Sequence, residues 1–168
     1  MTMTTSTSPG LSPRMGWATF DKSVPGAVAA LRSLGQAVDG TGLDKRLIEL
    51  VKVRVSQLNG CAFCLKLHLD WARQAGVPAI RLDLLATWRE ANCFEVRERA
   101  ALDWAEALTV MASQHITNDS YERAATQFSE VELAALTTAI AAINAWNRIA
   151  GSLRFEPPGM TTNLERTA

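Results

Sequence analysis

The sequence predicts an all-α fold, a compact bundle of roughly six helices. Apolar residues recur at spacings of three and four in several segments, which is the period of a helix with one buried face. No segment is better explained as a strand, because the one run that alternates with period two lies inside a longer helical pattern. Hydrophobic residues make up 48% of the 168 residues, which is enough for one domain with its own core.

The first expected helices lie in the N-terminal half of the chain. Residues 25–38 begin with Pro25 at a position where a helix tolerates proline. Residues 43–58 carry an apolar stripe with helical spacing that runs from Ile48 through Val55. The run VKVRVSQL inside this segment is the alternating one, but the stripe begins upstream of it. We therefore expect a helix over the whole segment.

An Asn-Gly break at 59–60 separates this helix from the next one, expected over residues 61–75. Gly76 and Pro78 follow, which is a common way for a helix to end. A short turn of helix is expected over residues 78–85.

Two more helices are expected towards the C-terminus. Residues 95–111 are amphipathic, and Asn118 or Asp119 is expected to cap a helix that runs to Phe128.

The last expected helix follows a capping box formed by Ser129 and Glu132. Its sequence, ELAALTTAIAAINAWNRIAG, is apolar on nearly all sides, and such a helix is normally buried. It is expected to lie either in a subunit interface or in the core of the monomer.

The chain is expected to form one helical domain over residues 17–155. Residues 1–16 are rich in Ser, Thr and Pro and predict a disordered tail without the apolar block of a secretory signal, and residues 156–168 predict a flexible tail. No apolar run approaches the ~18 residues of a membrane span. With no export signal, the expected compartment is the cytoplasm, where a CxxC pair is more often catalytic or metal-binding than structural.

Charge gives no indication of nucleic acid or membrane as a partner. Lys+Arg and Asp+Glu each number 17, so the formal net charge is zero. Nucleic-acid binding and attachment to an anionic membrane surface both need clustered positive charge.

The segment NGCAFCLKLH, residues 59–68, collects Cys61, Cys64 and His68 on one face of a helix. Cys61 stands where the helix begins, and free N–H groups there stabilise a thiolate and lower the cysteine pKa below its usual ~8.5. His68 lies one turn after Cys64 and can take its proton. These features meet the requirements of a dithiol that attacks an oxidant and then closes a disulfide. Thioredoxin-like proteins also use CxxC at a helix start, but after a strand, so a different scaffold is expected.

Glu49 precedes this pair on the helix before the Asn-Gly break. The resulting pattern E-x11-C-x-x-C-x3-H, within RLIELVKVRVSQLNGCAFCLKLHLDWARQAG, resembles the AhpD-like alkylhydroperoxidases of the carboxymuconolactone decarboxylase superfamily. The resemblance covers about residues 43–76, and AINAWNRIAGSLRF is similar to the closing helix of single-domain members. It implies an all-α fold with CxxC at the N-terminus of a central helix, assembled as a homo-trimer or homo-hexamer.

The resemblance also implies a thiol-dependent peroxidase that reduces hydroperoxides through a CxxC dithiol/disulfide cycle. By motif position, Cys64 is the implied peroxidatic cysteine and Cys61 the resolving one, while His68 and Glu49 form the implied proton relay. The redox-active disulfide would replace any separate cofactor, with a lipoyl or thioredoxin-like protein as the dithiol reductant. Phe63 departs from the best-known peroxidase pattern, which has a histidine just before the second cysteine.

Other interpretations remain open from the residues alone. The same four side chains could bind one zinc ion, although the chain has no second CxxC or HxxxH pair. Glu49 could form an ion pair with Lys45 or Lys52 on its own helix. A redox sensor without turnover and a decarboxylase of the same superfamily are further alternatives, but decarboxylation has no use for a dithiol.

The remaining residues with reactive or aromatic side chains have simpler interpretations. Cys93 has no partner by spacing and is expected to be structural, and His115 is expected in a surface loop. The tryptophans expected in the core are Trp71, Trp104 and Trp146.

Overall fold

The chain forms eight α-helices and one short 3-10 helix over residues 12–159, which are the residues that this computed structural model describes. The elements are α1 (Trp17–Ser23), α2 (Pro25–Asp39), α3 (Lys45–Leu58), α4 (Ala62–Gln74), α5 (Ala79–Asp83), η1 (Leu85–Thr87), α6 (Val96–Thr109), α7 (Asn118–Ala125) and α8 (Glu130–Leu153). No strand occurs among these residues, so the all-α prediction is confirmed. The count exceeds the predicted six. The expected turn after Pro78 divides into α5 and η1, and α1 is too short, with no buried residue, to show a periodic pattern.

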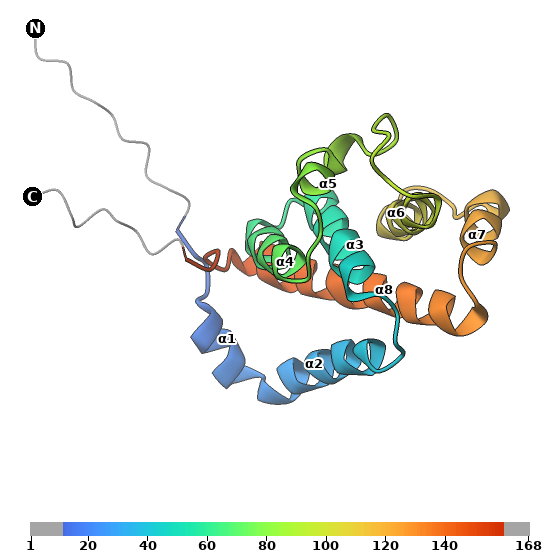
Figure 1. Cartoon of the computed structure of the whole chain (residues 1–168). Coiled ribbons are helices and arrows are strands. Elements are labelled where there is room, and N and C mark those ends of the chain that lie inside the picture. The colour runs from blue at the N-terminus through green and yellow to red at the C-terminus, as the bar shows by residue number, and fades with distance from the viewer. Residues whose placement is uncertain (1–11, 160–168) are drawn as a thin grey trace, which may run out of the picture.

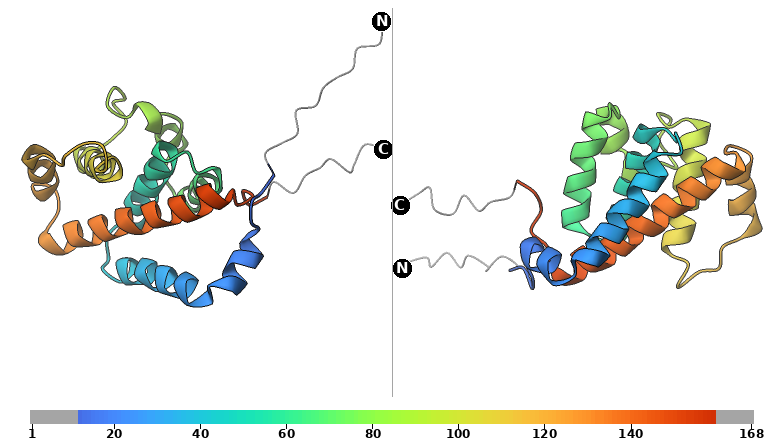
Figure 2. Two further views of the ribbon diagram at one scale, coloured as in Figure 1. Left: turned by 180° about the vertical axis from the view of Figure 1, so that it is seen from behind. Right: turned by 90° about the horizontal axis from the view of Figure 1, so that it is seen from below.

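The long helix α8 runs through the middle of the fold. It passes between α2 on one side and α3, α4 and α6 on the other (Figure 1). The view from below shows α2 running alongside it (Figure 2). Leu136, Ile140 and Ile143 of α8 are fully buried or nearly so. Packing inside the monomer therefore accounts for much of the apolar sequence of this helix.

Helix α3 is buried on two sides, which explains why its sequence is more apolar than a simple stripe. Ile48 and Val55 belong to the larger core cluster with residues of α6 and α8, whereas Leu50 and Val53 belong to a second cluster with residues of α4, α5 and η1. Fully burying one such side chain contributes about 1.5–3 kcal/mol. The two clusters together fix α3 firmly in place.

The helix caps largely follow the predicted chemistry. The Ser129–Glu132 capping box is present at the start of α8, as predicted. The expected cap of α7 is wrong by one residue: the hydroxyl of Thr117 accepts the N–H of Ser120, and Asn118 is the first helical residue. Thr117 is also a good capping residue, and sequence alone does not rank neighbouring candidates. The same helix ends at Ala125 rather than at Phe128.

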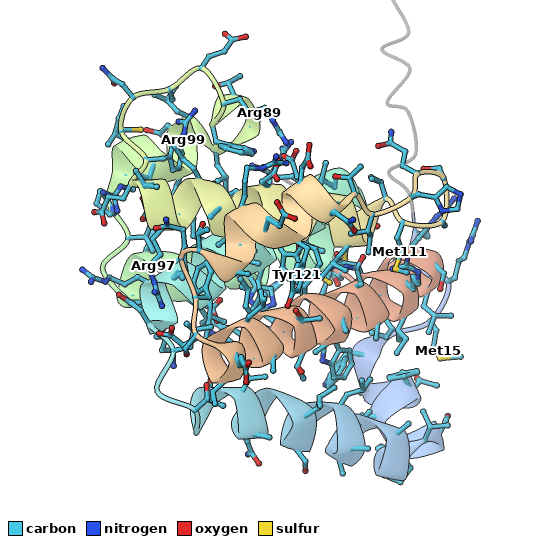
Figure 3. The ribbon with its side chains drawn as sticks, turned by 90° about the vertical axis from the view of Figure 1, so that its right-hand side faces the viewer. Met15, Arg89, Arg97, Arg99, Met111 and Tyr121 are labelled. Carbon is cyan, nitrogen blue, oxygen red and sulfur yellow. The ribbon has the colours of Figure 1, made fainter. Side chains whose placement is uncertain are left out.

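A network of charged side chains joins α6 to its neighbours on the face shown in Figure 3. The carboxylate of Glu106 accepts hydrogen bonds from Arg54 Nε at 2.6 Å, from Trp88 Nε1 at 2.8 Å and from Arg89. Arg99 holds the backbone of the connection before α6 by donating to three of its carbonyl groups, those of Trp88, Arg89 and Ala91. The bond between Arg54 and Glu106 joins α3 to α6.

The predicted tails fall mostly outside the described residues, since residues 1–11 and 160–168 are not among them. Within the predicted N-terminal tail, the backbone N–H groups of Arg14 and Met15 both donate to the carbonyl of Leu153 at the end of α8. None of the described helices combines the length and the apolar character that a membrane span requires.

Candidate functional site

A tight turn between α3 and α4 builds the site. Asn59 caps the end of α3, and Gly60 adopts a left-handed backbone with φ of +63°, which costs glycine little. The N–H of Cys61 then donates to the carbonyl of Ser56 at 3.1 Å. The chain reverses here, so α4 returns along α3 and residues far apart in the sequence come into contact.

Cys61 and Cys64 lie together at the start of α4. Cys61 is the N-cap residue, and its Sγ accepts the backbone N–H of Cys64 at 3.3 Å. Both side chains are buried free thiols. The pair therefore stands at the N-terminus of α4.

The two thiols differ in acidity. A hydrogen bond from the Cys64 thiol, the backbone N–H of Cys64 and the Asn147 amide together lower the pKa of Cys61 to about 7, against the opposing effect of burial. The pKa of Cys64 is raised, because its thiol donates to Cys61 and is itself buried. The pair therefore loses its first proton around neutral pH, and the resulting negative charge is held mainly on Cys61.

Glu49 and His68 form a buried pair across α3 and α4. His68 Nδ1 lies 2.7 Å from Oε2 of Glu49, while Oε1 of the same carboxylate accepts from Lys52 Nζ at 3.1 Å. Burial would raise the pKa of Glu49, but its bonds to His68 and Lys52 outweigh this and hold the pKa below its usual value. Burial lowers the pKa of His68, and Glu49 offsets only part of that effect. Glu49 is therefore a carboxylate and His68 a neutral ring at neutral pH.

A cavity of about 460 Å³ lies beside Cys64 and His68. Its walls are mostly apolar and come from α1, α2, α3, α4 and α8. They are formed by Trp17, Leu31, Arg32, Gly35, Gln36, Val38, Asp39, Lys52, Phe63, Cys64, Leu67, His68, Trp71, Ala139, Ala142, Ile143 and Trp146. Cys64 and His68 both border the cavity, whereas Cys61 is not among the lining residues. Of the two cysteines, a molecule in the cavity thus contacts Cys64.

Aromatic side chains form much of the wall beside the thiols. Phe63, between the two cysteines, stacks on Trp17 with ring centroids 6.2 Å apart and an interplanar angle of 14°. Trp71 lies edge-on to His68 at 5.1 Å. Trp104 lies in the core as expected, and Trp146 is half-buried and packs against the core cluster while it also lines the cavity. The expectation is wrong for Trp71, which lines the cavity and is 41% exposed.

Comparison with known proteins identifies the family. The model of the carboxymuconolactone decarboxylase family matches residues 16–107, which is more than half of the chain. The chain belongs to the carboxymuconolactone decarboxylase family. The match includes α1–α4 and therefore the Glu49–His68 pair and both cysteines.

Individual members and neighbours in structure support the AhpD-like resemblance. The uncharacterized protein YdfG of Bacillus subtilis (strain 168) is 36% identical over 109 residues, which are 65% of this chain and 74% of YdfG. A solved structure from Agrobacterium tumefaciens, of a protein of unknown function described as a candidate antioxidant defence protein AhpD, is 37% identical. Its TM-score is 0.82, over 88% of this chain and 99% of that one. The apo debrominase Bmp8 shares the fold at 19% identity and a TM-score of 0.74, over 82% of this chain and 74% of its own.

The arrangement of the side chains in the described part of the chain does not favour the zinc site considered from the sequence. In residues 12–159, no three His, Cys, Asp or Glu side chains converge so that they could hold a metal ion. Cys93 is half-buried beside the second core cluster, and His115 is exposed between α6 and α7, as expected of a surface residue.

Sequence reasoning did not assign three residues of this site, Lys52, Asn147 and Trp17, to the chemistry of the thiols. Lys52 was an alternative partner of Glu49, and it contacts the same carboxylate as His68 does. Asn147 is buried in α8 and acts on both thiols. A polar residue in an otherwise apolar helix is the one signal that points to it. Trp17 comes from a helix too short to predict.

Proposed function

We propose that this protein is a thiol-dependent peroxidase that reduces organic hydroperoxides through a Cys61–Cys64 dithiol/disulfide cycle. The observation that carries the proposal is the position of Cys64. Cys64 borders an apolar cavity, next to a second thiol and beside a buried Glu49–His68 pair. Membership of the family and the likeness to an AhpD candidate support the same function.

The first step is attack on the peroxide bond. His68, whose Nδ1 is bound to the Glu49 carboxylate, has its other ring nitrogen available to accept the Cys64 proton. The Cys64 sulfur then forms a bond to the terminal oxygen of the hydroperoxide, and the O–O bond breaks. The departing alkoxide takes the proton from His68 and leaves as an alcohol. Cys64 is now a sulfenic acid.

The second step closes the disulfide. The acidic thiol of Cys61 supplies a thiolate at neutral pH, and it attacks the sulfur of the Cys64 sulfenic acid. An S–S bond forms, and the hydroxyl leaves as water after gaining a proton. Two thiols are oxidised, and one hydroperoxide is reduced to alcohol and water. On this scheme the lowered pKa of Cys61 assists the second step, in which Cys61 is the nucleophile. It is therefore compatible with attack on the peroxide by Cys64.

A dithiol reductant must then reopen the disulfide by exchange. Because Cys64 borders the cavity and Cys61 does not, we propose that the reductant attacks Cys64. A lipoyl group has the slender chain and paired thiols that such a cavity admits, and a thioredoxin-like protein is the alternative. A homo-trimer or homo-hexamer is proposed from family resemblance.

A second candidate activity is reductive dehalogenation of an aromatic compound. The debrominase Bmp8 has this fold, and a cysteine-to-alanine variant of it was solved with 2,3,4-tribromopyrrole. The observation that favours it here is the aromatic wall of the cavity beside Cys64. In that reaction the two thiols become a disulfide while the carbon–bromine bond is replaced by carbon–hydrogen and bromide leaves. Bromide release from 2,3,4-tribromopyrrole tests it directly.

The test of the peroxidase is consumption of cumene hydroperoxide by the purified protein with dihydrolipoamide. Cys64→Ser and Cys61→Ser should both abolish turnover, and Cys64→Ser alone should also abolish the first, single-turnover reduction. Cys93→Ser is the matched control and should keep full activity. Oxidation by one equivalent of peroxide without turnover would identify a redox sensor. No reaction of the thiols with any peroxide would remove the proposal.

A further inference from the structure

Asn147 is a buried amide to which the proposed reaction assigns no role. It lies in the C-terminal half of α8 and is 3% exposed. A buried amide needs partners for its oxygen and for both of its N–H groups, because each unpaired group costs free energy. The partners therefore report what the side chain does.

Two of its neighbours fix the orientation of the amide. Asn59 Nδ2 donates to Oδ1 of Asn147 at 2.9 Å, and Asn147 Nδ2 donates to Oγ of Ser56 at 3.2 Å. The Ser56 hydroxyl proton is already committed to the carbonyl of Lys52 at 2.8 Å, so Ser56 can only accept from Asn147. A flipped amide would place its NH2 group against the donor Nδ2 of Asn59 and its oxygen against the acceptor Oγ of Ser56. One N–H of Asn147 remains for another acceptor.

The cysteine pair lies close to this part of α8. Ser56, which binds Asn147, also accepts the backbone N–H of Cys61 through its carbonyl. One turn further along α8, Gly151 lies on the same face, and a Cβ built there would lie 4.0 Å from Cβ of Cys61. The helix thus approaches Cys61 closely at this face. A hydrogen bond from Asn147 lowers the pKa of both thiols, as donation to a sulfur anion should.

We propose that Asn147 is a positioning residue that donates a hydrogen bond to the sulfur of Cys61 and stabilises its thiolate. Asn59 and Ser56 hold the amide in the orientation that this donation needs. The role of Cys61 as the resolving nucleophile rests on the proposed peroxidase function. The stabilised thiolate does not, because it is measured without any turnover.

A structural role alone is the competing explanation, since Asn147 joins α8 to the end of α3. Asn144 provides the matched control. It lies on the same helix, and its Oδ1 accepts from the same Asn59 Nδ2 at 2.9 Å. Removing either amide disturbs the link to Asn59, but only Asn147 acts on the thiols.

The experiment measures the thiolate of Cys61 alone, in full-length protein carrying Cys64→Ser and Cys93→Ser. Ultraviolet absorbance of the thiolate is followed against pH, with and without Asn147→Leu or Asn144→Leu. The midpoint should rise by about one pH unit with Asn147→Leu and stay unchanged with Asn144→Leu. An unchanged midpoint in a folded Asn147→Leu protein, or equal shifts in both variants, would overturn the proposal.

A second measurement covers the case in which Asn147→Leu does not fold. In the unsubstituted reduced protein, the side-chain amide protons of Asn147 should shift in NMR spectra with the same pH midpoint as the Cys61 thiol. Those of Asn144 should not follow this titration. An Asn147 signal that is insensitive to the thiol titration would overturn the proposal. A titrating Asn147 in a protein without peroxide turnover would keep this inference and remove only the peroxidase.

Discussion

Nδ1 of His68 lies 2.7 Å from Oε2 of Glu49, and neither residue is more than 6% exposed. The contact joins α3 to α4 at a point where the sequence alone allowed Glu49 to be a solvated partner of a lysine. Both descriptions are partly right, because the second carboxylate oxygen binds Lys52. The paired carboxylate fixes the tautomer of the ring and leaves its other nitrogen available as a base.

Glu49→Gln should lower peroxide turnover about 100-fold while the cysteines still react with alkylating agents. The amide keeps the shape of the side chain but loses the charge that stabilises a protonated His68. Steady-state kinetics with cumene hydroperoxide provide the measurement. Glu122→Gln, at an exposed position on α7, is the control and should leave kcat unchanged. Equal turnover in both variants would remove Glu49 from the relay.

Stability should fall as the pH is lowered below about 6.5, and His68 should cause much of this fall. Its pKa in the folded protein is lower than its ordinary value of 6.5. Between these two values the unfolded chain binds a proton that the folded protein does not, so acid favours unfolding. Glu49 has the same sign in its own window, below 4.5.

Urea unfolding between pH 7 and pH 5 tests this dependence. His68→Gln should flatten the dependence of the unfolding free energy on pH over that range. His115→Gln, which removes the exposed second histidine, should retain it. A dependence that disappears with His115→Gln instead would contradict the assignment.

The cavity should favour bulky apolar hydroperoxides over hydrogen peroxide, because its walls are aromatic and aliphatic. Trp71→Ala should raise KM for cumene hydroperoxide about 10-fold and change the rate with hydrogen peroxide little. Tyr121→Ala, on α7 (Figure 3) and not among the residues that line the cavity, is the control. If Trp71→Ala changes the kinetics with both peroxides equally, the tryptophan affects the reaction by its contact with His68 and not by binding the substrate.

Phe63→Ala should loosen α1, since Trp17 of α1 stacks on this ring and no residue of α1 is buried. The unfolding free energy should drop by about 2 kcal/mol, less than for a fully buried phenylalanine. Trypsin should also cut after Lys22 of α1 faster than in the unsubstituted protein. Val131→Ala, at an exposed site, should change neither. Unaltered cleavage after Phe63→Ala would show that other contacts hold α1.

The sequence could predict the elements with strong local signals. Helices α3, α4 and α8 were predictable because turn or capping residues mark their ends and an apolar period runs along their length. The cysteine pair at the start of α4 was predictable from local sequence too, since residues three and four apart share a helix face. Helix α1 was not, because seven residues without a buried face have no period to detect.

What the sequence determined by itself is the helical class and the local constellation of Cys61, Cys64 and His68, since both depend on spacing along one segment. The tertiary structure decided which cysteine borders the cavity, which thiol is the more acidic, and how close α8 comes to Cys61. These properties depend on burial and on hydrogen bonds between helices. Asn147 and Cys61 are separated by several helices along the chain, and no local pattern specifies how closely α8 approaches α4.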